Sequence, residues 1–157
     1  MVKIRRLEER DTTAVKNLIH EIMNGEFQAE KAVFVHDDLD SLMDSYGRLG
    51  EAFFVAEDGR RVVGTIGVKR EDERVALIRR VFVAPEYRKR KIGSQLLNRA
   101  IEFCEEVGYD DVVFKTTSRM SGAIELFKNR GFKPRAKVPV GKEELLKFSM
   151  ALKGERC

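Results

Sequence analysis

The sequence predicts an α/β fold of the α+β type, in which a central mixed, mostly antiparallel β-sheet of about seven strands is flanked by four helices. Residues 51–57 and 61–69 are β-rich runs joined at Asp58-Gly59, a two-residue turn typical of antiparallel hairpins. The apolar run 76–83 leads through a loop into an amphipathic helix and then into a strand at 111–116, which is a right-handed crossover if the two strands are parallel. Apolar periodicity elsewhere completes the element order β-α-α-β-β-β-α-β-α-β-β.

Length and composition favour one soluble domain that covers residues 1–157. A chain of 157 residues has the usual size of a single domain and can bury a core. Charged residues make up 36% of the chain and hydrophobic residues 43%, which fits a globular protein rather than a disordered one. No apolar run approaches the ~20 residues of a membrane span, and the N-terminus lacks the apolar core of a signal peptide. We therefore expect a cytoplasmic protein without membrane contact.

The N-terminal third is predicted to hold one strand and two helices. The strand covers Val2 to Arg6. Asp11 can cap a helix that Gly25 ends, because apolar residues between them recur at helical spacing on one face. A linking segment, 26–36, separates this helix from a second one expected over residues 37–46.

The C-terminal half is predicted to complete the sheet. The helix after the crossover strand has an apolar stripe that includes Cys104, which we interpret as a core residue rather than a nucleophile. A further helix ends at Gly131, and residues 132–138 and 145–152 are expected to form the last two strands. Since Cys157 is the only other cysteine, the sequence has neither a disulfide framework nor metal-ligand spacing.

A basic loop precedes the helix that follows the strand at 76–83. Residues 88–91 are four consecutive cations in a chain whose net charge is only +4, so positive charge is concentrated here. The first N–H groups of a helix lack intrahelical partners and lie at the positive end of its dipole, and Gly93 lets a ligand approach the backbone. The loop has neither the P-loop pattern nor GxGxxG. It predicts a diphosphate site, and nucleic acid is disfavoured because no aromatic or groove-reading motif accompanies the cations.

This loop resembles the acyl-CoA-binding signature of the GCN5-related N-acetyltransferase (GNAT) family, in which a Val-x-Val-like strand end meets an Arg/Gln-x-x-Gly-x-Gly/Ala loop. Arg88 fills the first position, Lys91 replaces the first glycine and Gly93 fills the last. Residues 122–132 resemble the family's Ala-x-x-Leu-Tyr-x-x-x-Gly-Phe segment. With the matching element order, the resemblance covers nearly the whole chain and implies the GNAT fold.

The resemblance implies acetyl-CoA as co-substrate and no metal. Backbone groups at the strand end are expected to pair with the pantetheine arm like an added strand. Backbone N–H groups of the loop and helix start are expected to hold the pyrophosphate, and Phe127, where a tyrosine is usual, is expected to be an apolar wall. The predicted cofactor-binding residues are Val81, Phe82, Val83, Arg88, Lys89, Arg90, Lys91, Ile92, Gly93, Ser94 and Phe127.

The implied reaction is direct attack of a neutral primary amine, on a small molecule or a peptide or protein N-terminus, on the acetyl thioester. Leu77 stands where some members place a glutamate base and Phe127 where they place a tyrosine acid, and neither can transfer a proton. No catalytic residue is therefore assigned. Alternative bases are Glu26, His36, Glu57 and Glu73. Deprotonating an α-amine of pKa ~8 near neutral pH costs under ~1 kcal/mol, against ~4 kcal/mol for a lysine amine, which favours α-amine acceptors.

Two other function classes stay open at this point. A CoA-binding regulatory or interaction module with a degenerate active site would bind acetyl-CoA without transfer, as Leu77 and Phe127 suggest. A nucleic-acid-binding domain would use the basic loop and show salt-sensitive binding that CoA does not compete. The segments expected to shape the acceptor pocket, 25–38 and 139–144, carry no readable motif. A homodimer is expected on base rates alone.

Overall fold

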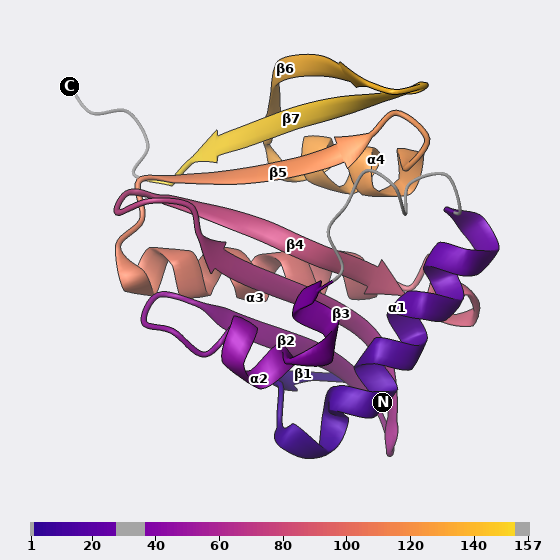
Figure 1. The fold of residues 1–157 in the computed structure, drawn as a ribbon. Helices are drawn as coiled ribbons and strands as arrows, with labels where there is room; N and C mark the ends of the chain where they lie inside the picture. The colour runs from indigo at the N-terminus through magenta and orange to yellow at the C-terminus, as the bar shows by residue number, and fades with distance from the viewer. Residues whose placement is uncertain (1, 28–36, 153–157) are drawn as a thin grey trace.

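The structure is a computed structural model that describes residues 2–27 and 37–152. Its seven strands form one sheet in the order β1-β2-β3-β4-β5-β7-β6, with helices on both faces (Figure 1). This is the predicted fold. The strands are β1 (Val2–Arg6), β2 (Ala52–Asp58), β3 (Arg61–Arg70), β4 (Val75–Val83), β5 (Asp111–Thr117), β6 (Lys133–Val140) and β7 (Glu143–Ala151). The helices are α1 (Thr12–Glu26), α2 (Leu42–Ser45), α3 (Ile92–Val107) and α4 (Ser121–Arg130), and η1 (Glu9–Asp11), η3 (Asp37–Asp40) and η4 (Pro85–Tyr87) are 3-10 turns.

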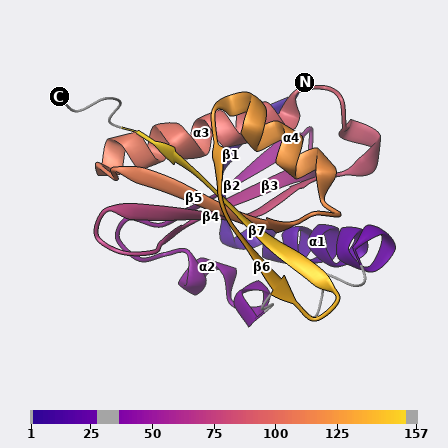
Figure 2. The same ribbon diagram turned by 90° about the horizontal axis from the view of Figure 1, so that it is seen from above.

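The sheet has one parallel pair at its centre. Strands β1 to β4 form an antiparallel meander, β4 pairs with β5 in parallel, and β7 pairs antiparallel with both β5 and β6. Helices α3 and α4 lie on one face of the sheet, whereas α1 and α2 lie on the other (Figure 2). The expected crossover is therefore present, with α3 connecting β4 to β5.

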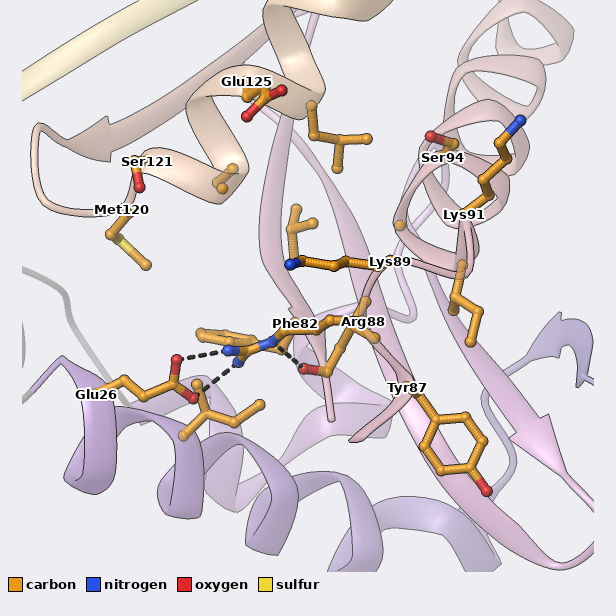
Figure 3. Close-up of a pocket in the computed structure, with 18 of the residues that line it drawn as sticks. Glu26, Phe82, Tyr87, Arg88, Lys89, Lys91, Ser94, Met120, Ser121 and Glu125 are labelled. Carbon is orange, nitrogen blue, oxygen red and sulfur yellow. Dashed lines mark hydrogen bonds and ion pairs between the residues drawn. The ribbon is translucent and has the colours of Figure 1, made fainter. Parts of the chain in front are cut away.

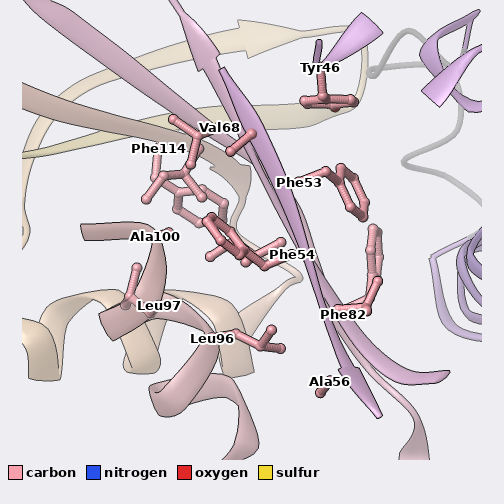
Figure 4. Packing of buried hydrophobic residues seen from close by; sticks show 14 of the residues in the cluster. Tyr46, Phe53, Phe54, Ala56, Val68, Phe82, Leu96, Leu97, Ala100 and Phe114 are labelled. Atoms are coloured by element: carbon pink, nitrogen blue, oxygen red, sulfur yellow. The ribbon is translucent and has the colours of Figure 1, made fainter. Parts of the chain in front are cut away.

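The hydrophobic core has one layer on each face of the sheet (Figure 4). On the α3 face, Leu96 and Leu97 are fully buried and the ring of Phe54 lies 6.0 Å from that of Phe103. On the α1 and α2 face, the rings of Tyr46 and Phe53 meet edge to face at 4.9 Å. Burial of each such leucine or phenylalanine contributes about 1.5–3 kcal/mol, so the two layers fix the helices against the sheet.

The predicted second helix is wrong in length. It is split into η3 and α2, and the Tyr46 hydroxyl donates a hydrogen bond of 2.6 Å to Asp38 Oδ2. In a continuous helix two residues eight positions apart would be separated by about 12 Å along the axis, so this contact requires the break at Ser41.

Two further predictions are corrected. Asp11 does not cap α1 with its side chain, because its carboxylate accepts hydrogen bonds from Arg5 Nη1 at 2.8 Å and from the Glu8 backbone N–H at 2.8 Å. Pro139, expected in a loop, lies inside β6. A proline is tolerated there because β6 is an edge strand.

Cys104 is a core residue, as predicted, since its side chain is buried. Burial raises the pKa of its thiol to about 12. In a Cys157→Ser background we expect no reaction with a thiol reagent at pH 8, and full reaction after unfolding. Because the unfolded thiol ionises first, stability should fall as pH rises above its ordinary value of 9.0 toward 12, by about 1.4 kcal/mol per pH unit. Rapid labelling of the folded protein would contradict this assignment.

None of the helices in residues 2–27 and 37–152 is long and apolar enough to cross a membrane.

Candidate cofactor and active site

Strands β4 and β5 separate near the middle of β4. Their register ends at the pair Ile78 and Phe114, although β4 continues to Val83. Just beyond this pair, two residues of β4 lie opposite the single residue Ile66 of β3, and one of them, Arg80, has a left-handed φ of 58°. Such a β-bulge bends the strand and increases its twist. The second half of β4 therefore turns away from β5 and leaves a gap between the two strands.

A pocket of about 820 Å³ lies at this end of the sheet (Figure 3). Its walls come from the end of α1, the end of β4, the basic loop, the start of α3 and the first half of α4. This volume lies within the range of small-molecule sites. The predicted residues that line it are Val81, Phe82, Val83, Arg88, Lys89, Lys91, Ile92, Gly93 and Ser94.

Two predicted cofactor residues lie outside the pocket. The Arg90 guanidinium stacks over the Tyr87 ring at 4.9 Å. Phe127 is fully buried, with its ring stacked at 3.7 Å on Phe114 and edge to face with Phe132 at 4.8 Å. The prediction that Phe127 forms the pocket wall is therefore wrong, because aromatic packing holds the side chain in the core.

The start of α3 presents unpaired backbone donors to the pocket. The first helical hydrogen bond runs from Gln95 N–H to Lys91 C=O at 3.1 Å, so the three preceding N–H groups have no partner within the helix. Lys89 and Lys91 have φ of 64° and 63°, the left-handed region in which a non-glycine residue costs roughly 1–2 kcal/mol. Lys91 thus adopts the backbone conformation that glycine usually takes, with its cationic side chain retained.

Space is tight where α3 approaches α4. A Cβ on Gly93 would lie 3.3 Å from Leu126 Cδ2, so this residue allows the close contact between the two helices. Gly93 also lines the pocket. A larger side chain would have to extend into the volume that the unpaired donors face.

Arg88 bridges the pocket mouth to α1. Its guanidinium donates to both carboxylate oxygens of Glu26, at 2.6 and 2.8 Å, and its Nε donates to Val83 C=O at 3.1 Å (Figure 3). Arg88, whose charge is expected to help hold a pyrophosphate, therefore lies at the pocket, but the carboxylate of Glu26 partly neutralises it. No local sequence pattern predicts this pair, because its members are 62 positions apart.

A buried ion-pair cluster supports the bulge. Arg80 Nε donates to Asp38 Oδ2 at 3.0 Å, and the Thr65 hydroxyl donates to Arg80 C=O at 2.7 Å. Burial alone would raise the pKa of Asp38, but hydrogen bonds from Arg80 and Tyr46 bring it below its ordinary value. Burial and the Asp38 charge raise the pKa of Tyr46. Neither group can exchange a proton readily near neutral pH, so the cluster is structural.

The alternative bases have different positions. Glu26 lines the pocket, whereas Glu57 lies at the β1–β2 pair, where Arg5 Nε donates to it at 3.0 Å. Glu73 is in the exposed turn before β4, and His36 lies outside the described residues. Glu125 and Arg119 also line the pocket, although no sequence motif marks them as site residues. Within residues 2–27 and 37–152, no group of three or more His, Cys, Asp or Glu is placed to hold a metal ion.

Comparison with protein families and curated proteins gives consistent matches. Residues 16–132 match the family model described as the acetyltransferase (GNAT) family. The chain is 33% identical over 113 residues to a probable N-acetyltransferase camello of Xenopus tropicalis, covering 69% of this chain and 51% of that protein. It is 31% identical over 104 residues to N-acetyltransferase 8B of Rattus norvegicus, covering 62% and 47%. The chain thus spans about half the length of these relatives.

Solved structures match over nearly the full length. A GNAT-family acetyltransferase from Staphylococcus aureus Mu50 superposes with a TM-score of 0.84 at 25% identity, covering 97% of this chain and 99% of that one. The putative acetyltransferase yncA from Salmonella typhimurium, solved with acetyl-CoA, has a TM-score of 0.82 at 20% identity, covering 99% and 96%.

Proposed function

The chain belongs to the GNAT acetyltransferase family, and on that premise we propose that it transfers an acetyl group from acetyl-CoA to a primary amine. The observation that carries the proposal is the pocket, in which unpaired N–H groups at the start of α3 and the cations of the basic loop adjoin the gap between β4 and β5. Helix N-termini with adjacent cations bind phosphate groups, and an unpaired strand edge can take up an extended chain. These residues fit the diphosphate and the pantetheine arm of CoA.

Each part of the pocket then has a binding role. The N–H groups of Ile92, Gly93 and Ser94, with Arg88, Lys89 and Lys91, hold the diphosphate. Backbone groups of Val81 to Val83 align the pantetheine arm and direct an N–H toward the acetyl oxygen, where negative charge develops during attack. Acetyl-CoA supplies the acetyl group as a thioester, whose thiol has a pKa of ~8.5 and leaves without an acid partner.

The acceptor is an amine of low pKa, such as the α-amine of a small molecule or of a peptide N-terminus. Leu77 and Phe127 cannot transfer protons, so the amine loses its proton to ordered water. For an α-amine of pKa ~8 this costs under ~1 kcal/mol near neutral pH, against ~4 kcal/mol for a lysine side chain. We therefore expect this chain to act faster on α-amines than on lysine side chains.

Calorimetric titration with acetyl-CoA, followed by thiol release against α-amino, ε-amino and polyamine acceptors, tests this function. Binding with turnover on α-amines is the expected result. Binding without turnover on any acceptor would support the second candidate, a CoA-binding regulatory module, which Leu77 and Phe127 favour. Preference for ε-amines would overturn the acceptor assignment, and absence of binding would overturn the proposed function.

Removing the charge of Glu26 should tighten acetyl-CoA binding. In Glu26→Gln, no carboxylate neutralises Arg88 at the pocket wall. A partly exposed ion pair contributes up to ~1 kcal/mol, so we expect the Kd for acetyl-CoA to be about two- to fivefold lower. Glu102→Gln is the matched control, because Glu102 pairs with Arg99 at 3.2 Å outside the pocket lining, and should leave the Kd unchanged. Weaker binding in Glu26→Gln would instead show that Glu26 positions Arg88.

A further inference from the structure

Positively charged side chains lie in a row across the sheet, beginning where β4 and β5 separate. Lys115 and Lys147 are direct partners in the β5–β7 register. Arg79 is the first residue of β4 beyond its last pair with β5, and Lys115 is the first residue of β5 beyond the same pair. On β6, Arg135 donates to the Ser149 hydroxyl at 2.8 Å. The row therefore extends from β4 through β5 and β7 to β6.

These cations share one face of the sheet. Leu77 is paired with Lys69 on β3 and with Val113 on β5, and side chains of paired residues point to the same face. Since side chains alternate along a strand, Arg79 and Lys115 lie on the face of Leu77. Lys147 and Ser149 lie on this face too, because they are paired with Lys115 and Val113 of β5.

This face is the one from which an acceptor can approach. Helix α3, whose start carries the proposed diphosphate site, lies on the opposite face with α4. On the row's own face α1 and α2 cover β2 to β4, and no described helix covers β5, β7 and β6 (Figure 1). A nucleophile that reaches the gap between β4 and β5 from this side passes over the row.

The row carries an excess of positive charge. Lys115 is half-buried and Lys147 exposed, and neither has an ion-pair partner among the residues that the structure describes. Directly opposed like charges on adjacent strands are destabilising. At the gap, Arg79 Nη2 lies 3.9 Å from Asp38 Oδ1, and Arg80 forms a close pair with the same carboxylate. The side chains of the row repel one another, and together they form a surface that is complementary to a ligand with several negative charges.

We propose that this row selects an acidic peptide N-terminus as acceptor, with carboxylates in the residues that follow the reacting α-amine. The inference rests on the proposed acetyl transfer and specifies its acceptor. Paired strands are ~4.8 Å apart, and β4 and β5 lie farther apart than that beyond Ile78 and Phe114. Since an extended chain rises ~3.3 Å per residue, Arg79 to Lys147 spans at least about three peptide residues. A single carboxylate would engage only part of the row.

Matched peptides test the inference. A peptide with three aspartates after an N-terminal glycine is compared with its three-asparagine counterpart at low ionic strength. We expect kcat/KM to be at least about tenfold higher for the acidic peptide, mainly through KM, and the ratio to fall as salt screens the charges. Lys115→Gln and Lys147→Gln should reduce the ratio while leaving the Kd for acetyl-CoA unchanged. Both variants remove a repulsion, so their thermal stability should be maintained or increased.

Lys3→Gln provides the control. Lys3 is exposed on β1, at the opposite edge of the sheet, and the substitution makes the same change in charge. It should leave the ratio unchanged. Equal rates on both peptides would overturn this inference and retain the proposed function. Transfer to free aspartate or glutamate but to no peptide would overturn the peptide assignment, and transfer to no acceptor would overturn the proposed function itself.

Discussion

Replacing Gly93 with glutamate should weaken acetyl-CoA binding by at least about 100-fold. Gly93 lies at the start of α3, next to the unpaired N–H groups and within the pocket lining. A carboxylate there would occupy these donors itself and repel the diphosphate, and juxtaposed like charges in an interface cost several kcal/mol. The helix should still form, because an acidic residue in the first turn is favourable to the helix dipole.

Two controls separate charge from size. Gly93→Gln has nearly the same shape without the charge, and Gly93→Ala adds only a Cβ 3.3 Å from a flexible leucine methyl group. Calorimetry should give Kd values in the order alanine, glutamine, glutamate, with the largest step at glutamate. If Gly93→Gln and Gly93→Glu weakened binding equally, steric exclusion would explain the effect and the diphosphate would not lie at this helix N-terminus.

Asp38→Ala should destabilise the protein by about 3–5 kcal/mol, the usual cost of leaving a buried charge without its partner. Arg80 and Asp38 are both at least nine-tenths buried, so water cannot replace the lost carboxylate. A chain of this size loses roughly 2–4 °C in Tm per kcal/mol, so thermal unfolding should occur at least about 6 °C lower.

The matched control for this substitution is Asp40→Ala. Asp40 lies in the same 3-10 turn and pairs with Lys16, but its side chain is 73% exposed. Its loss should change stability by less than about 1 kcal/mol. Equal effects of the two substitutions would contradict the assignment of the buried cluster as a stabilising unit. Since the pKa of Asp38 is lowered, its contribution should be present above its ordinary value of 3.8 and disappear as pH falls below that value.

Most of the fold could be predicted from the sequence because its signals are local. The Asp58-Gly59 turn fixed the β2–β3 hairpin, and the apolar stripe ending at Cys104 marked the buried face of α3. The break between η3 and α2 could not be predicted, since it accompanies tertiary contacts of Asp38 with Tyr46 and with Arg80 of β4, which is 42 positions away.

The candidate site divides in the same way. The basic loop and Gly93 are adjacent in the sequence to the start of α3, so the sequence alone predicted that they lie together. Glu26, though weighed as a base, could not be recognised as the partner of Arg88. Phe127 was misplaced because its position in the motif does not tell which way the ring turns, and packing against Phe114 decides that. The cation row depends on strand register across four strands, which no local pattern specifies.

Because of the bulge at Arg80, the gap between β4 and β5 depends on the number of residues in β4. Between the pairs Gly67–Arg79 and Thr65–Phe82, β4 has one residue more than β3. Deleting that residue should let β4 run on beside β5, and continuous hydrogen bonding would then close the gap between the two strands. We therefore expect the number of residues between Leu77 and the basic loop to matter to the site independently of which residues they are.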